Sequence, residues 1–305
     1  MTIFQAIIIG IVQGLTEFIP ISSTAHLIFA SKALDLFGGA GAQLQAEQTT
    51  ATIAVVQLGT LLAVLIYFAP DILTITVAFV RDHVAMLSGG GTRPRESRGA
   101  SGAIVGRRSR LSDDARLGWL VVVGSIPVGV VGLLFKKQIE GTFTKNLWVI
   151  AAMMIFVALL LAVAEKVGSQ RRGMSELGLR DALAVGCSQV LSLIPGASRS
   201  GSTIMGGLFA GEKRETAARF SFLLSIPAIA ASGLLELKEA MHKLPEGSAL
   251  PLVVATVTAG VVGYASIWLL LKYLRTHSTA VFIFYRLALG AALLLMLWRG
   301  VLSPV

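Results

Sequence analysis

The sequence predicts an all-α polytopic membrane protein with six transmembrane helices, two re-entrant helical hairpins and an inverted-topology repeat. Three observations lead to this fold class. Hydrophobic residues make up 54% of the 305 residues and charged residues only 14%, whereas about 25% of an average soluble domain is charged. Long stretches carry no charge, and two further apolar segments are interrupted by proline. These features exclude a soluble globular enzyme, a disordered chain and a coiled coil.

Six segments are long enough to cross a bilayer, whose hydrocarbon core of about 30 Å requires roughly 20 apolar residues in a helix. Five of them contain no Asp, Glu, Lys or Arg, and the sixth carries Arg286, which we interpret as structural. The predicted spans are 48–70, 117–135, 146–164, 220–235, 247–271 and 278–298.

Two apolar regions, 1–37 and 182–211, are broken in the middle, the first at Pro20 and the second at Pro195-Gly196. Each half is too short to span, so we expect two re-entrant hairpins. The breaks also resemble each other, since Gln13-Gly-Leu-Thr-Glu-Phe-Ile-Pro-Ile-Ser-Ser-Thr aligns with Gln189-Val-Leu-Ser-Leu-Ile-Pro-Gly-Ala-Ser-Arg-Ser after small shifts. Matched broken helices in two halves indicate an inverted repeat with a binding site between them.

The chain is therefore predicted to be one integral membrane domain, 1–305, with a first repeat over about 1–165 and a second over about 180–302.

Positive charge predicts the orientation. Most of the 26 lysines and arginines fall in four loops, and such loops stay in the cytoplasm. The loops are 81–116, with its Arg/Gly-rich part 89–116, and 166–180, 213–219 and 272–275. Both termini and the mouth of the first hairpin then face outward, and the hairpins enter from opposite faces.

The net charge of +9 is accounted for by these loops and does not indicate nucleic-acid binding. A single cysteine, Cys187, excludes an internal disulfide and a thiolate metal site.

The first break collects polar groups at membrane depth, where ionisable residues usually pair or line a watery site. Gln13 and Glu17 are four residues apart and share a helix face. After Pro20, Ser22 or Ser23 can cap the next helix, and His26 follows one turn beyond Ser23. Glu17 could be only a structural hydrogen-bond partner and His26 only a packed histidine, and serines at such positions are caps by default.

The second break offers an anion site. Gly196 opens a turn, and Ser198, Arg199, Ser200 and Thr203 supply hydroxyls and a guanidinium where a helix begins. A helix N-terminus favours anions, and arginine can bind phosphate with two parallel hydrogen bonds. Together the two breaks indicate phosphate chemistry more strongly than any single residue does.

The same residues carry a resemblance to a known family. Gln13-Gly-Leu-Thr-Glu-Phe-Ile-Pro-Ile-Ser-Ser-Thr-Ala-His26 and Pro195-Gly-Ala-Ser-Arg-Ser-Gly-Ser-Thr203 resemble the two signatures of the undecaprenyl-pyrophosphate phosphatases, the bacitracin-resistance proteins of bacteria. Val56-Gln-Leu-Gly-Thr-Leu-Leu-Ala-Val and Phe220-Ser-Phe-Leu-Leu-Ser-Ile-Pro227 are similar as well. The family accepts Glu or Gln at the position of Gln13, so Gln13 is not expected to be an indispensable acid.

The resemblance implies hydrolysis of undecaprenyl diphosphate to undecaprenyl phosphate and inorganic phosphate, which recycles the lipid carrier for peptidoglycan and confers bacitracin resistance. It also implies a divalent cation, Mg²⁺ or Ca²⁺, a place in the bacterial inner membrane, and a site open to the periplasm. The expected partners are the polyprenyl diphosphate lipid and the bilayer. Nucleic acid is not expected as a partner, and the chain can also pair with a second copy of itself as a homodimer.

The resulting mechanistic hypothesis gives each residue a role. Arg199 holds the diphosphate with Ser198 and Thr203, while Ser22, Ser200 and Gly196 complete the binding site. Glu17, assisted by Gln13, positions the metal or orients the nucleophile. Ser23 attacks phosphorus and His26 takes its proton. His26 itself or a metal-activated water are alternative nucleophiles.

The competing function is a membrane transporter or flippase of a polyprenyl phosphate lipid, because inverted repeats with broken helices are typical of transporters. A transporter needs no serine–histidine pair, so Ser23 and His26 favour an enzyme.

Overall fold

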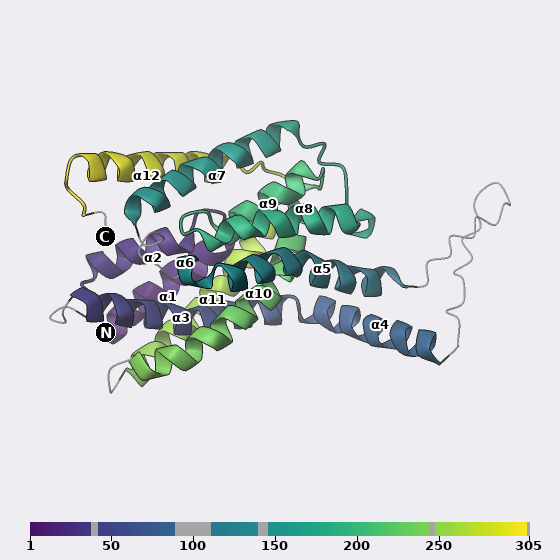
Figure 1. The fold of residues 1–305 in the computed structure, drawn as a ribbon, viewed down its shortest axis with the longest axis horizontal. Helices are drawn as coiled ribbons and strands as arrows, with labels where there is room; N and C mark the ends of the chain where they lie inside the picture. Colours follow the sequence, from purple (N-terminus) through teal and green to yellow (C-terminus); the bar gives the residue numbers. More distant parts are fainter. Residues whose placement is uncertain (38–41, 89–110, 140–145, 244–247, 304–305) are drawn as a thin grey trace.

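The computed structural model describes residues 1–37, 42–88, 111–139, 146–243 and 248–303, and every regular element in these ranges is helical (Figure 1). The elements are α1 (Ile3–Phe18), α2 (Ser23–Ala33), α3 (Ala42–Tyr67), α4 (Ala69–Leu87), α5 (Asp113–Leu134), α6 (Lys136–Ile139), α7 (Leu147–Val167), η2 (Met174–Glu176), α8 (Leu179–Val190), η3 (Leu191–Leu193), α9 (Arg199–Phe209), α10 (Arg214–Lys243), α11 (Ala249–Leu274) and α12 (Ala280–Trp298).

Five of the described helices are long and apolar enough to cross a membrane: α3 from Glu47, α5, α7, α11 and α12. They coincide with five of the predicted spans, so the prediction of a multi-pass helical membrane protein is confirmed. The remaining predicted span, 220–235, lies inside α10, which is not among the five. A sixth transmembrane helix therefore stays a prediction.

The segment 81–116, expected to be a cytoplasmic loop, is helical at both ends. The first helix after α3 continues through residue 81 to Leu87, and α5 already begins at Asp113. Residues 89–110 of this segment lie outside the described residues. Charge alone suggested a loop, but Arg81 pairs with its neighbour Asp82 within α4 at 3.0 Å, and Asp113 and Asp114 lie in the first turn of α5.

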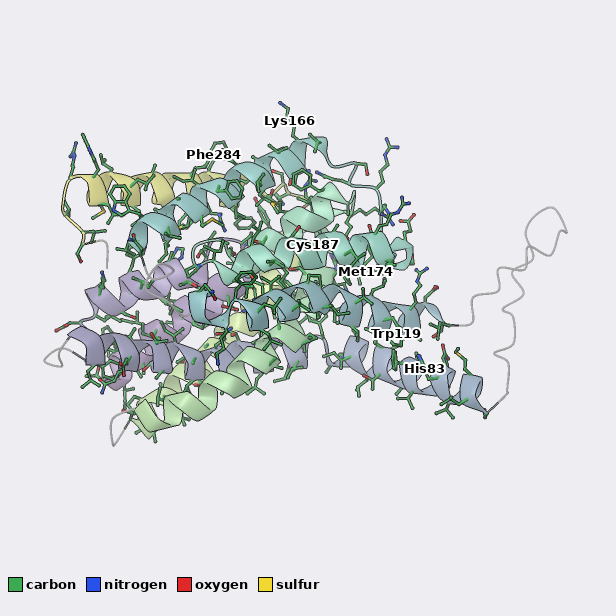
Figure 2. The ribbon with its side chains drawn as sticks, viewed as in Figure 1. His83, Trp119, Lys166, Met174, Cys187 and Phe284 are labelled. Atoms are coloured by element: carbon green, nitrogen blue, oxygen red, sulfur yellow. The ribbon has the colours of Figure 1, made fainter. Side chains whose placement is uncertain are left out.

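Local contacts explain why these ends are helical. Ser112 caps α5, since its side chain accepts a hydrogen bond from Ala115 N, and Asp82 of α4 accepts one from Ser112 N at 2.7 Å. Trp119 Nε1 lies 3.1 Å from His83 Nε2, which joins α5 to α4 where the two helices lie side by side (Figure 2). The helix ends are thus held by side chains whose polarity predicted a loop.

Small residues let the helices approach closely, as in many membrane proteins. A Cβ on Gly14 of α1 would lie 2.8 Å from Ala259 O of α11, and one on Gly59 of α3 would lie 2.0 Å from Thr256 O of the same helix. A Cβ on Gly186 of α8 would meet Gly124 O of α5 at 2.2 Å. Glycine is therefore required at these helix crossings.

Both broken segments fold as helix pairs, with the breaks at Pro20 and at Pro195-Gly196 as predicted. The pair α1–α2 packs through α1 on α11, and the pair α8–α9 packs through α8 on α5. In the same way α3 packs on α10 and α7 on α12. Each pair therefore contacts a long helix from the other half of the chain. The marked N and C termini lie at the same end of the molecule (Figure 1).

Candidate active site

Each break ends in a serine with an unusual backbone. Ser22 has φ 78° and Ser198 has φ 68°, and each is the N-cap of the helix that follows, α2 or α9. Positive φ is uncommon and costly for residues other than glycine. The two corresponding turns thus place a serine and the N-terminus of an eleven-residue helix at the tip of each hairpin.

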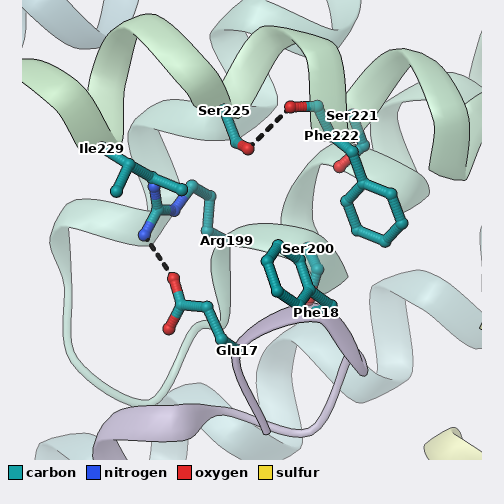
Figure 3. A pocket seen from close by; sticks show the side chains of 8 residues that line it. All are labelled: Glu17, Phe18, Arg199, Ser200, Ser221, Phe222, Ser225 and Ile229. Carbon is teal, nitrogen blue, oxygen red and sulfur yellow. Dashed lines mark hydrogen bonds and ion pairs between the residues drawn. The ribbon is translucent and has the colours of Figure 1, made fainter. Parts of the chain in front are cut away.

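An ion pair joins the two tips. Arg199 Nη2 donates to Glu17 Oε1 at 2.6 Å, and the side chains are 18% and 6% exposed (Figure 3). Gln13 Nε2 donates to the other oxygen, Glu17 Oε2, at 3.1 Å, and Ser200 Oγ donates to Ile19 O at 3.3 Å. Since an unpaired charge at membrane depth costs about 2.5 kcal/mol or more, this pairing holds the tips together.

A second arginine holds the main chain of both tips. Arg286 of α12 has 0% exposure and donates to Pro20 O at 3.3 Å, Gly196 O at 3.0 Å and Ala197 O at 2.9 Å. It also donates to main-chain carbonyls of α7, and it forms no ion pair within the described residues. These contacts agree with the structural role assigned to Arg286 from the sequence. They show that Arg286 stabilises the main chain of the two breaks that form the site.

Gly196 is required in this arrangement. Its φ is 93°, and a Cβ there would lie 2.3 Å from Ile150 O of α7. The break can therefore pass close to α7 only with glycine at this position.

Between the tips lies a polar cavity of about 130 Å³, room for several waters at about 30 Å³ each. It is lined by Gln13, Glu17, Ser22, Ser23, Thr24, Leu27, Ile53, Gln57, Ser192, Ile194, Pro195, Gly196, Ser198 and Arg199. Two buried polar atoms at this cavity, Gln13 Oε1 and Ser22 Oγ, have no hydrogen-bond partner.

The structure brings seven of the ten sequence-predicted site residues to this cavity: Gln13, Glu17, Ser22, Ser23, Gly196, Ser198 and Arg199. Ser200 lies on the other side of the Glu17–Arg199 pair, in a smaller hollow that it shares with Ser221 and Ser225 (Figure 3). Thr203 is fully buried and bonds to Arg199 O at 2.8 Å and to the Ser221 hydroxyl. Thr203 therefore supports α9 and does not face the cavity.

His26 is not placed as predicted. It does not line the cavity, and both ring nitrogens have other partners: Nδ1 lies 2.7 Å from Ser22 O and Nε2 lies 2.6 Å from Tyr285 Oη. Spacing along a helix put His26 one turn after Ser23, but its ring is held by Ser22 O and by Tyr285 of α12. The expected Ser23–His26 contact is not formed among the described residues.

Seven lining residues were not among the predicted site residues: Thr24, Leu27, Ile53, Gln57, Ser192, Ile194 and Pro195. Gln57 could have been predicted, because it is an amide side chain inside an uncharged span. Polar groups inside membranes are costly and usually line a polar site. Nothing comparable marked the two isoleucines.

The fold and this site define a class: a multi-pass helical membrane protein in which two broken helix pairs enclose a buried polar cavity crossed by a carboxylate–guanidinium pair. The comparisons make the family specific. Residues 6–292 match the family model described as bacitracin resistance protein BacA, and the chain belongs to this family.

Relatives match over the full length. The undecaprenyl-diphosphatase of Syntrophobacter fumaroxidans is 47% identical over 302 residues, covering 98% of this chain and 99% of that protein. The undecaprenyl-diphosphatase of Chlorobaculum tepidum is 45% identical and covers 100% of both chains. That of Mycolicibacterium smegmatis is 46% identical over 306 residues, 99% of each chain.

Proposed function

We propose that this chain is an undecaprenyl-diphosphate phosphatase that releases inorganic phosphate and leaves undecaprenyl phosphate. The full-length relatives named undecaprenyl-diphosphatase support this activity. The observation that supports the location of the chemistry is the cavity in which one carboxylate, one guanidinium and two helix N-termini meet.

The diphosphate binds at the second tip in this proposal. Arg199 uses one nitrogen for Glu17 and keeps further N–H donors for phosphate, because a guanidinium carries five. The N-terminal turn of α9 adds main-chain N–H groups and its dipole, and so does α2 at the facing tip. Leu27, Ile53 and Ile194 form the apolar side of the cavity and suit the first isoprene units.

We also propose the divalent cation that the family resemblance implies, Mg²⁺ or Ca²⁺. Both cations prefer oxygen ligands, and the cavity lining supplies the Glu17 carboxylate together with the side-chain oxygens of Gln13 and Ser22, which have no hydrogen-bond partner. When bound, the cation neutralises charge on the diphosphate. Chelation with EDTA should abolish phosphate release, and adding either cation back should restore it.

Ser23 supplies the nucleophile in this scheme. Its Oγ attacks the terminal phosphorus, the bond from that phosphorus to the bridging oxygen breaks, and water then hydrolyses the phosphoserine. Glu17 is the one carboxylate among the described residues that line the cavity. It therefore accepts the serine proton, the role first assigned to His26.

Purified protein in detergent, with a short-chain prenyl diphosphate labelled on its terminal phosphate, tests the proposal. Wild type should release phosphate and, after rapid acid quenching, carry label on serine. Ser23→Ala should lose both signals. Ser125→Ala, whose hydroxyl bonds only within α5, is the matched control and should keep both. Lipid movement without phosphate release by wild type would instead support a transporter.

The orientation and the repeat are further parts of the proposal. We infer that the two halves form an inverted repeat, six helices span the inner membrane, and the cavity opens to the periplasm. The exchange of partners between halves, α1 on α11 and α8 on α5, supports the repeat. The positive segments 166–180, 213–219 and 272–275, which include the start of α10 and the end of α11, support a cytoplasmic face opposite the termini. The homodimer stays a prediction, for light scattering in detergent to measure.

A further inference from the structure

Tyr285 on α12 reaches the first hairpin through His26. Its hydroxyl lies 2.6 Å from His26 Nε2, and the two rings stack with centroids 5.6 Å apart and an interplanar angle of 12°. The next residue, Arg286, holds Pro20 O at the same break. Two adjacent residues of α12 therefore hold the turn that leads into α2.

The partners of His26 determine where its protons lie. Nδ1 is 2.7 Å from Ser22 O, and a carbonyl oxygen can only accept, so Nδ1 carries a hydrogen. In the neutral ring Nε2 then has a lone pair and accepts the Tyr285 O–H. The imidazole is fixed at both ends, and its tautomer is set by the bond at the other nitrogen, as is usual for histidine.

The carbonyl that His26 holds belongs to the strained residue of the tip. Ser22 has φ 78° and no side-chain capping bond, and the helical N–H of His26 is 3.5 Å from Ser22 O, longer than the bond from the ring. The ring thus replaces a weak first helical hydrogen bond. It holds the peptide that directs Ser22 and Ser23 into the cavity.

We propose that Tyr285 is a positioning residue. Its hydroxyl donates to Nε2 and so holds the Nδ1–H imidazole in place, and that ring holds the Ser22 carbonyl and so the turn carrying the proposed nucleophile. Within the proposed phosphatase function, on which this inference rests, His26 acts through the main chain and does not transfer the serine proton.

Asn and Gln at position 26 separate the two roles. The amide nitrogen of Asn lies where Nδ1 of histidine lies, whereas that of Gln lies where Nε2 lies, and neither amide is a base at neutral pH. His26→Asn should therefore keep kcat within about tenfold of wild type, and His26→Gln should lose about a hundredfold, since a hydrogen bond to a strained carbonyl is lost. Equal, near-complete inactivity of both variants would mean that His26 transfers a proton and would overturn the proposal.

Tyr285→Phe keeps the ring and removes the hydroxyl. It should lower kcat about fivefold to tenfold, the effect of one hydrogen bond, with KM unchanged because Tyr285 does not line the cavity. In the His26→Asn background it should have no further effect, because coupled residues give non-additive losses. Tyr264→Phe is the matched control, because Tyr264 is 45% exposed and Tyr285 is 44% exposed. This control should keep the wild-type kcat. Wild-type kcat in Tyr285→Phe would overturn the proposal.

A readout independent of activity separates failure of this inference from failure of the proposed function. The chain has four histidines, and ¹⁵N-histidine NMR in detergent, assigned with His26→Asn, reports the tautomer of His26. Wild type should show the Nδ1–H form, and in Tyr285→Phe the Nε2 resonance of that form should shift because its hydrogen bond is lost. An unchanged Nε2 resonance in Tyr285→Phe would refute the inference even in an active enzyme. Absence of phosphate release by wild type would refute the proposed function alone.

Discussion

Glu212 lies in the turn between α9 and α10, outside the five long apolar helices, and its side chain is fully buried. Neither carboxylate oxygen has a hydrogen-bond partner. Burial, with repulsion from Asp181, raises the pKa of Glu212 from 4.5 to about 8, against an opposing effect of Arg172. The folded protein therefore holds a proton on Glu212 at neutral pH that the unfolded chain releases.

The perturbation is Glu212→Gln, which keeps the shape and cannot ionise. Because the pKa of Glu212 is raised in the folded state, its contribution to stability is complete below pH 4.5 and falls as pH rises to about 8. At about 1.36 kcal/mol per pH unit, wild type loses about 5 kcal/mol relative to the variant across this window. For a chain of this size, that loss of stability lowers the Tm of wild type relative to the variant by roughly 10 °C.

The assay is thermal unfolding in detergent from pH 4 to 9 for wild type and variant. The difference in Tm, variant minus wild type, should climb between about pH 5 and 8 and then level off. Ser169→Ala, which removes a nearby hydroxyl bonded to Gly211 O and no ionisable group, should give a difference independent of pH. A flat difference for Glu212→Gln over the same range would refute the reasoning.

Three further predictions concern the site and its orientation. Arg199→Lys should fold and insert but lose about 10- to 100-fold in phosphate release, because lysine keeps the charge without the planar donor pair; near-normal turnover would remove Arg199 from the site. Glu17→Gln should be almost inactive in the same assay whereas Gln13→Glu should be tolerated, and equal damage from both would contradict their separate roles. In a cysteine-free background of intact cells, cysteine in place of Val301 should react with an impermeant thiol reagent and cysteine in place of Ser175 should not; the reverse pattern would invert the orientation.

The sequence predicted the class of fold and the meeting of the two breaks because both depend on local properties. A run of uncharged residues such as 146–164 has few alternatives to a buried or lipid-facing helix. A proline in a short apolar segment breaks a helix wherever the segment lies. Charged groups beside such breaks, Glu17 and Arg199, must find partners at that depth, so their proximity could be expected before the pairing at 2.6 Å was seen.

Only the tertiary structure decided which way the side chains at the breaks point. His26 follows Ser23 at helical spacing, yet its orientation depends on the strained backbone of Ser22 and on Tyr285, which is 259 residues away in the chain. Likewise Gln57 reaches the cavity because α3 packs beside α1, and Arg286 reaches both breaks because α12 packs on α7. Spacing along one helix specifies a face, and the packing of distant helices determines what that face meets.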